Sequence, residues 1–149
     1  MAMDEAALLA QGWKRLSGVR YTAALGPTFG RIVDGRPMVG LLALDHLGND
    51  NLGIVHGGAM MTFADIALGY GLGHANDGRG NFVTTQMQVQ FIAAAQVGEF
   101  ITCAPEVIRK TGSMAFVRGL IVAGDRGVAS ADAIFKLLDP AKFAAIKAG

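Results

Sequence analysis

The chain has 149 residues, of which 52% are hydrophobic and only 17% are charged, and its formal net charge is +1. This length predicts a single domain, 1–149, that can bury a substantial core. The near-zero charge excludes a nucleic-acid partner drawn in by a basic surface. Cys103 is the only cysteine, which excludes an internal disulfide and a cysteine-based zinc site. The surplus of apolar over charged residues favours contacts between subunits, so we expect an oligomer.

The N-terminal segment, 1–20, predicts a short amphipathic helix over 4–16, which contains Leu8 and Trp13 and is ended by Gly18. The first twelve residues lack the basic start of a secretory signal and carry two early acids. We therefore expect a cytoplasmic protein.

A β-hairpin is predicted next along the chain. Residues 29–33 have a strand pattern, Asp34-Gly35 between two apolar runs is typical of a tight turn, and 38–44 forms the return strand. The polar stretch 45–51 is expected to be a loop.

The stretch 58–73 is apolar or small almost throughout, and Asp65 is its only charge. It is shorter than the roughly 20 residues of a membrane span, and its acid opposes insertion, so we expect no membrane contact. A helix that is apolar on all faces must instead be covered by protein. A carboxylate inside such a buried helix is costly to ionise unless something compensates its charge.

The rest of the chain predicts four strands, which cover 82–93, 99–110, 114–123 and 127–138. Because the loops between them are short, successive strands are expected to pair antiparallel. Pro105 predicts a bulge or an exposed backbone position within the second of them. Residues 142–147 predict a short helix in the C-terminal tail, 139–149.

Two strands, one long helix and four further strands predict an α+β fold in which one antiparallel sheet curves around the helix. The sheet would cover one side of the helix. A partner subunit or the flanking segments would cover the rest.

The sequence His56-Gly57-Gly58 leads directly into the long helix. Glycines let the backbone approach another group closely, and the first turn of a helix has N–H groups without partners. Such an amide can stabilise the negative charge that develops on an oxygen in acyl chemistry, while Asp65 can activate water. Two plainer interpretations stay open: Asp65 as a structural acid, and His56 as an ordinary turn residue.

The segment 51–73 resembles the hotdog-fold acyl-CoA thioesterases, with the phenylacetate-pathway (PaaI-type) branch as the nearest match. The likeness rests on the pattern Asp-Asn-x-Gly-x-x-His-Gly-Gly at 50–58 and on the acid Asp65 in the helix that follows. It extends over 41–138, through the order of the elements and the strand sequence at 83–91.

This resemblance implies a homodimer or homotetramer with two active sites at each dimer interface. Each site would combine the His56-Gly57 loop of one subunit with Asp65 of the other. Asp65 is similar to the family acid that acts as general base or nucleophile, and the Gly57 N–H would polarise the thioester carbonyl. His56 would orient the loop or the substrate, and Thr84, or Thr85 beside it, would position the water.

One position departs from the family pattern. Relatives often have Asn or Gln six residues before the His, whereas this chain has Asp50, with Asn51 beside it. An ionised carboxylate cannot donate a hydrogen bond. Either Asn51 takes the helper role or the site uses Asp50 differently. The departure also motivates an alternative function, a non-catalytic acyl-CoA-binding or sensing module on the same fold.

The implied substrate is an aryl- or medium-chain acyl-CoA, in which CoA is part of the substrate, with no other cofactor and no metal. Met61 and Phe82 could line the acyl pocket. A turn between two strands would contact the CoA nucleotide, since basic side chains suit phosphates; the alternative is a solvated hairpin tip. The substrate-binding candidates are Gly58, Met61, Phe82, Arg109, Lys110, Gly112 and Ser113.

Overall fold

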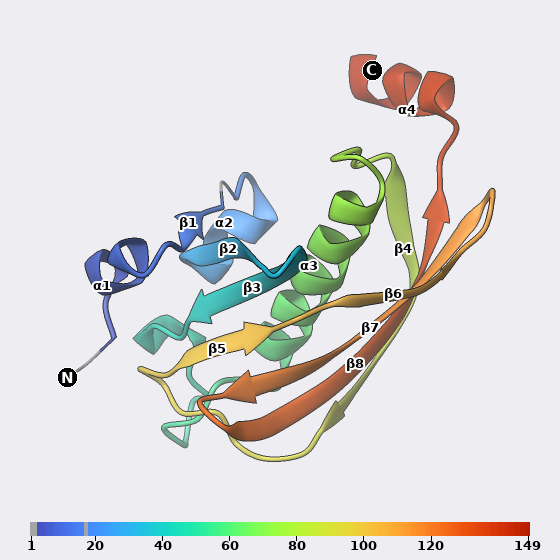
Figure 1. Cartoon of the computed structure of the whole chain (residues 1–149). Coiled ribbons are helices and arrows are strands. Elements are labelled where there is room, and N and C mark those ends of the chain that lie inside the picture. The colour runs from blue at the N-terminus through green and yellow to red at the C-terminus, as the bar shows by residue number, and fades with distance from the viewer. Residues whose placement is uncertain (1–2, 17) are drawn as a thin grey trace.

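A computed structural model describes residues 3–16 and 18–149, and in it a long helix lies against a curved antiparallel sheet (Figure 1). The predicted α+β hotdog architecture, with the central helix wrapped by the sheet, is confirmed. Residues 1, 2 and 17 of the predicted N-terminal segment lie outside the described residues. The helices are α1 (Glu5–Ala10), α2 (Tyr21–Leu25), the 3₁₀ turn η1 (Asp45–Leu47), the central α3 (Gly57–Ala75) and α4 (Pro140–Ala148).

The described part of the chain forms one sheet of eight strands, and all of their pairings are antiparallel. The strand order is β1-β2-β3-β5-β7-β8-β4, and β6 also pairs with β7. One edge of the sheet is therefore β4. The bounds are β1 (Lys14–Arg15), β2 (Thr28–Val33), β3 (Arg36–Leu42), β4 (Phe82–Phe91), β5 (Phe100–Cys103), β6 (Glu106–Lys110), β7 (Met114–Ala123) and β8 (Arg126–Leu137).

Helix α3 packs one face on the sheet and leaves the other face open. Its buried residues recur every three or four positions, a spacing that places them on one side of a helix. The opposite face, which includes Met61, Thr62 and Asp65, is exposed or half-buried in the single chain. The sheet thus covers one side of the helix, as predicted. The buried residues are Met60, Phe63, Ala64, Ala67, Leu68, Gly71 and Leu72.

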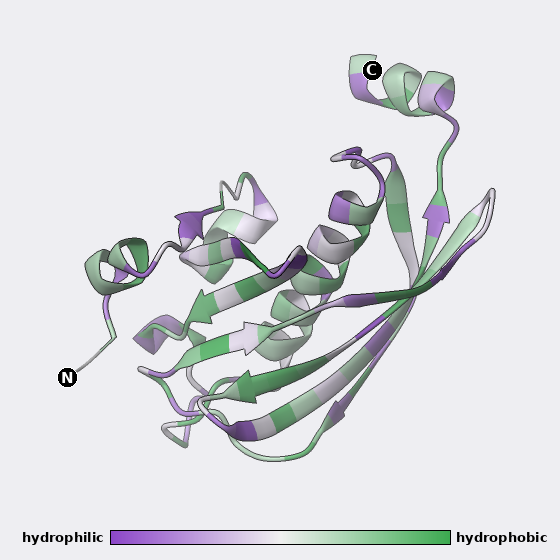
Figure 2. Ribbon diagram, in the orientation of Figure 1, coloured by the Kyte–Doolittle hydropathy of each residue, from purple (hydrophilic) through white to green (hydrophobic). Residues whose placement is uncertain are grey.

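The two faces of the sheet carry separate apolar clusters, because side chains alternate along each strand. The larger cluster fills the space between α3 and the sheet. A smaller cluster on the opposite face contains Leu8 of α1, Trp13, Phe29 and Leu42. Figure 2 shows hydrophobic residues along β3, β5, β7 and α3.

The predicted helix over 4–16 is wrong beyond Ala10. The chain turns at Gly12, which has a positive φ of 88°, and Lys14 and Arg15 then pair with β2. Trp13 is buried in the second cluster, where the Arg31 guanidinium lies 4.5 Å from its ring centroid. Helix α2 was not predicted.

The predicted strand over 99–110 is two strands, β5 and β6, separated at Pro105. Proline has no N–H for the ladder, and this ring packs so closely on Gly71 of α3 that a Cβ on the glycine would lie 2.6 Å from it. The expected pairing of 82–93 with the next strand is also wrong, because β4 pairs with β8. Residues between β4 and β5 cross to the start of α3, where the N–H of Val55 donates to the carbonyl of Ala95 at 2.8 Å.

The other predicted elements are confirmed, with ends shifted by at most two residues. The strand 114–123 coincides with β7, and 142–147 lies inside α4, whose first turn is capped by Asp139. The loop 45–51 contains the short turn η1. Within residues 3–16 and 18–149, no helix combines the length and the hydropathy needed to cross a membrane.

Candidate functional site

The N-terminal turn of α3 presents a free backbone amide. His56 is the extended N-cap residue, and its Nδ1 accepts the Gly58 N–H at 2.9 Å. Since Nδ1 accepts, a neutral ring carries its proton on Nε2. Gly57 is the first helical residue, and its N–H has no hydrogen-bond partner within residues 3–16 and 18–149. This amide is therefore available to a ligand, as the sequence predicts.

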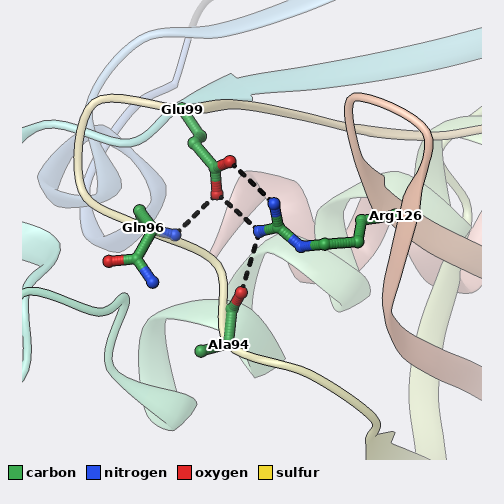
Figure 3. A network of polar contacts seen from close by, with 4 residues as sticks. All are labelled: Ala94, Gln96, Glu99 and Arg126. Carbon is green, nitrogen blue, oxygen red and sulfur yellow. Dashed lines mark hydrogen bonds and ion pairs between the residues drawn. The ribbon is translucent and has the colours of Figure 1, made fainter.

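The segment between β4 and β5, which pairs with the residues before this turn, is held in place by an ion pair between Glu99 and Arg126 (Figure 3). Arg126 Nη2 lies 3.0 Å from Glu99 Oε2 and donates to the Ala94 carbonyl at 3.0 Å. The Gln96 N–H donates to the same carboxylate at 2.7 Å. This backbone hydrogen bond, aided by Arg126 and opposed by partial burial, holds the pKa of Glu99 below its ordinary value. The network fixes the residues that pair with Ile54 and Val55, directly before His56.

Asp65 is joined to strand β4 by a short hydrogen bond. The Thr84 hydroxyl donates to Asp65 Oδ1 at 2.6 Å, whereas the Thr85 hydroxyl donates to the carbonyl of Ile134 at 2.9 Å. A bulge between Thr84 and Gln86 sets these directions. The structure thus places Thr84, of the two candidates, beside the acid. Asp65 is half-buried rather than enclosed, because it lies at the margin of the open face of α3.

Gly57 and Asp65 do not meet within one chain. They lie eight residues apart on one helix, and a helix rises about 12 Å over that length. At that separation, a water held by Asp65 lies too far from a carbonyl group whose oxygen is held by the Gly57 N–H. Any site that uses both must take one of them from a second copy of the chain.

Two cavities flank the start of α3. One, of about 460 Å³, is lined by Asp50, His56, Gly58 and side chains of α2 and η1. The other, of about 340 Å³, borders Gly57 and is mostly apolar, with Met60, Phe91 and Ile92 in its wall. Asp50 therefore shares a cavity with His56.

Asn51 lies outside the linings of both cavities, and its N–H donates to the side chain of Asn49 at 3.0 Å. Met61 and Phe82 also lie outside them. Met61 is 38% exposed on the open face of α3. Phe82 packs edge-on against Phe135, at a centroid distance of 5.4 Å.

A third cavity, of about 540 Å³, lies at the far end of α3 and is rich in lysine. Three of the nucleotide candidates, Lys110, Gly112 and Ser113, line it, but Arg109 does not. Lys136 and Lys142 also line it, and sequence reasoning missed them. Only the pairing of β7 with β8, which sets Met114 opposite Lys136, could have revealed the first of these lysines. Lys110 Nζ donates to Asn76 Oδ1 at 2.6 Å.

No cluster of three or more His, Cys, Asp or Glu side chains in the described ranges, 3–16 and 18–149, could hold a metal ion. Cys103 is buried, and burial raises the pKa of its thiol to about 12. A thiol with such a pKa is neutral near pH 7 and therefore a poor nucleophile.

Residues 52–130 match the family model described as the thioesterase superfamily. Over 113 residues the chain is 33% identical to "Putative esterase PA0474" of Pseudomonas aeruginosa, a match that covers 76% of this chain and 84% of that protein.

Solved structures share the fold at lower identity, which shows the fold alone. The conserved protein PA5202 of Pseudomonas aeruginosa matches with a TM-score of 0.71 and 24% identity, over 81% of this chain and 95% of that one. A hypothetical thioesterase from Streptococcus pneumoniae, solved with coenzyme A, matches with a TM-score of 0.65 and 20% identity, over 78% of this chain and 89% of that one. A mutant of the phenylacetic acid degradation protein PaaI from Thermus thermophilus matches with a TM-score of 0.65 and 18% identity, over 79% of this chain and 98% of that one.

Proposed function

This chain belongs to the thioesterase superfamily, and we propose that it hydrolyses the thioester of an aryl- or medium-chain acyl-CoA to the free acid and CoA. Asp65 supplies the base or nucleophile, and the Gly57 N–H polarises the thioester carbonyl. The observation that carries this proposal is that α3 has both a free amide at its start and an acid, Asp65, that is held by Thr84.

The proposed active site is shared between two copies of the chain. Strand β4 is an edge of the sheet and can pair with β4 of a second copy. In an antiparallel pairing, the Thr84 end of one strand lies near the Phe91 end of the other. The Phe91 ring stands close to Gly57, since a Cβ built there would be 3.5 Å from it. Such a dimer, alone or within a tetramer, brings Asp65 of one copy toward Gly57 of the other.

The reaction follows from these positions. Asp65 takes a proton from water, and the oxygen of that water attacks the carbonyl carbon. The charge that moves to the carbonyl oxygen is stabilised by the Gly57 N–H. The tetrahedral intermediate then loses its C–S bond, and the proton on Asp65 passes to the departing sulfur. Because Thr84 occupies Oδ1, the water is left with Oδ2.

The lysine-rich cavity suits the phosphates of CoA. Lys110 and Ser113 can donate hydrogen bonds to phosphate oxygens, and charge-assisted bonds of this kind are the strong ones. The coenzyme A in the Streptococcus pneumoniae structure agrees with a substrate of this class. Asp50 and His56, in the cavity beside the turn, would contact the substrate or the attacking water.

Removal of the Gly57 amide tests the proposal directly. Gly57→Pro deletes the N–H at the first helical position, which accepts proline, and His56 already has the extended backbone that precedes proline (φ −61°, ψ 137°). Gly57→Ala keeps the N–H and is the matched control. Gly57→Pro is expected to slow thiol release from acyl-CoA by about 100-fold or more, while Gly57→Ala retains most of it.

A mixing experiment tests the sharing of the site. Asp65→Asn and Gly57→Pro are each expected to be inactive, but a dimer of one with the other has one intact site. Random reassembly should therefore restore about a quarter of the wild-type rate. No recovery in demonstrated mixed dimers would contradict a shared site.

Saturable binding of acyl-CoA without turnover by the wild-type protein would favour the alternative, a non-catalytic binding module. That outcome would agree with a helper position held by Asp50, which as a carboxylate cannot donate.

A further inference from the structure

The first turn of α3 contains two glycines, Gly57 and Gly58, which have no side chains to fix them by packing. Glycine is the most permissive residue for backbone conformation. A donor aimed at a developing charge is effective only if it is held in place before the reaction. The direction of the Gly57 N–H therefore depends on the hydrogen bonds that hold its neighbour, Gly58.

Two side chains hold Gly58 from opposite ends. Its N–H donates to His56 Nδ1 at 2.9 Å, and its carbonyl accepts the Thr62 hydroxyl at 3.0 Å. Thr62 lies on the open face of α3, three residues before Asp65, and residues at that spacing are neighbours on a helix surface. Thr62 thus stands between the turn and the proposed catalytic acid.

Thr62 is itself held by Tyr21 of α2, whose hydroxyl lies 3.0 Å from Thr62 Oγ1. The single hydroxyl proton of Thr62 goes to Gly58, so Tyr21 is the donor of this second bond. A contact between His46 Nε2 and the Ala24 carbonyl, at 3.0 Å, anchors the other end of α2. Because α2 has only five residues and no side-chain cap, these contacts position it.

We propose that Tyr21 and Thr62 are positioning residues for thioester hydrolysis. Through Gly58 they hold the two-glycine turn so that the Gly57 N–H points at the carbonyl oxygen. The inference rests on the proposed function, and neither side chain is assigned a contact with the reacting atoms.

Variants that remove single hydroxyls test this inference in the full-length protein, with one acyl-CoA that the wild type hydrolyses. Thr62→Val keeps the side-chain shape and loses the hydroxyl, and it is expected to lower kcat roughly tenfold with little change in KM. Thr62→Ser keeps the hydroxyl and should restore most of kcat. Tyr21→Phe should lower kcat about threefold, and since its ring is 71% exposed, it leaves the core intact.

The double variant Tyr21→Phe/Thr62→Val gives the sharpest readout. If Tyr21 acts through Thr62, the double variant loses no more activity than Thr62→Val alone, whereas independent effects multiply. Tyr70→Phe is the matched control, because Tyr70 is the only other tyrosine and lines a different cavity. It should leave kcat unchanged.

Unchanged kcat in Thr62→Val, or multiplied losses in the double variant, would overturn the inference and leave the proposed function standing. A fall in kcat matched by an equal fall in folded protein, measured by circular dichroism, would overturn it as well. Absence of thiol release by the wild type over a panel of acyl-CoAs would overturn both proposals.

Discussion

The Thr84 hydroxyl donates to Asp65 Oδ1 over 2.6 Å, and this bond ties an edge strand of the sheet to the open face of the central helix. It fixes the rotamer of the one carboxylate on α3. An acid held in this way presents its second oxygen in a constant direction, as a catalytic base requires.

Loss of the Thr84 hydroxyl should impair the reaction, whereas loss of its neighbour should not. Thr84→Val is expected to lower kcat for acyl-CoA hydrolysis roughly tenfold, because Asp65 can then rotate. Thr84→Ser should retain most activity. Thr85→Val is the control, since the Thr85 hydroxyl bonds the Ile134 carbonyl instead. Equal losses in Thr84→Val and Thr85→Val would contradict a specific role for Thr84.

The Glu99 network should make stability depend on pH. Because folding lowers the pKa of Glu99 below its ordinary value of 4.5, its contribution is present above that pH and is lost as the pH falls through the folded-state value. Glu99→Gln should therefore lower the free energy of unfolding by up to about 1 kcal/mol at pH 7, and the difference should shrink in acid. Urea unfolding of the wild type and Glu99→Gln, from pH 7 down into acid, measures this difference in free energy. A difference of the same size in acid would contradict a role for the ionised Glu99 carboxylate.

Cys103 should be unreactive until the chain unfolds. Its thiol is buried with a pKa raised to about 12, so at pH 8 almost no thiolate is accessible in the native state. A thiol reagent should label it slowly in buffer and fast in urea. As the only cysteine, it then reports unfolding directly. Rapid labelling of the native protein would contradict the burial of this side chain.

A methyl group at Gly119 should collide with Cys103. A Cβ there would lie 2.5 Å from the Cys103 sulfur and 3.3 Å from Leu68 Cδ2. Gly119→Ala is expected to lower the free energy of unfolding by about 1–3 kcal/mol, as overpacking does. Cys103→Ala in the same chain should recover part of this loss. Gly80→Ala is the control, because its added Cβ meets nothing within 4 Å.

Much of the fold could be predicted because hydrophobic pattern and turn residues agree along most of the chain. The apolar run of α3, the alternation in β4 and the glycine-rich turns around β7 each specify one type of element. The N-terminal region was mispredicted because burial of Trp13 against Arg31 outweighs the helical pattern around it. Helix α2 depends on contacts with Thr62 and His46, which are distant in the sequence.

The sequence names candidate site residues, but it does not give their geometry. His56, Gly57 and Asp65 stand out by type and spacing. The choice between Thr84 and Thr85 depends on a bulge against β8, which no local pattern indicates. Lys136 and Lys142 reach the lysine-rich cavity only because β8 and the tail return beside the turn after β6.

Under the proposed mechanism, the eight-residue separation of Gly57 and Asp65 along one helix makes activity depend on the protein concentration. If the two groups work together, a newly made or highly diluted copy is inert toward CoA esters. Turnover per chain would then rise with concentration and level off once pairing is complete, so association itself switches the chemistry on.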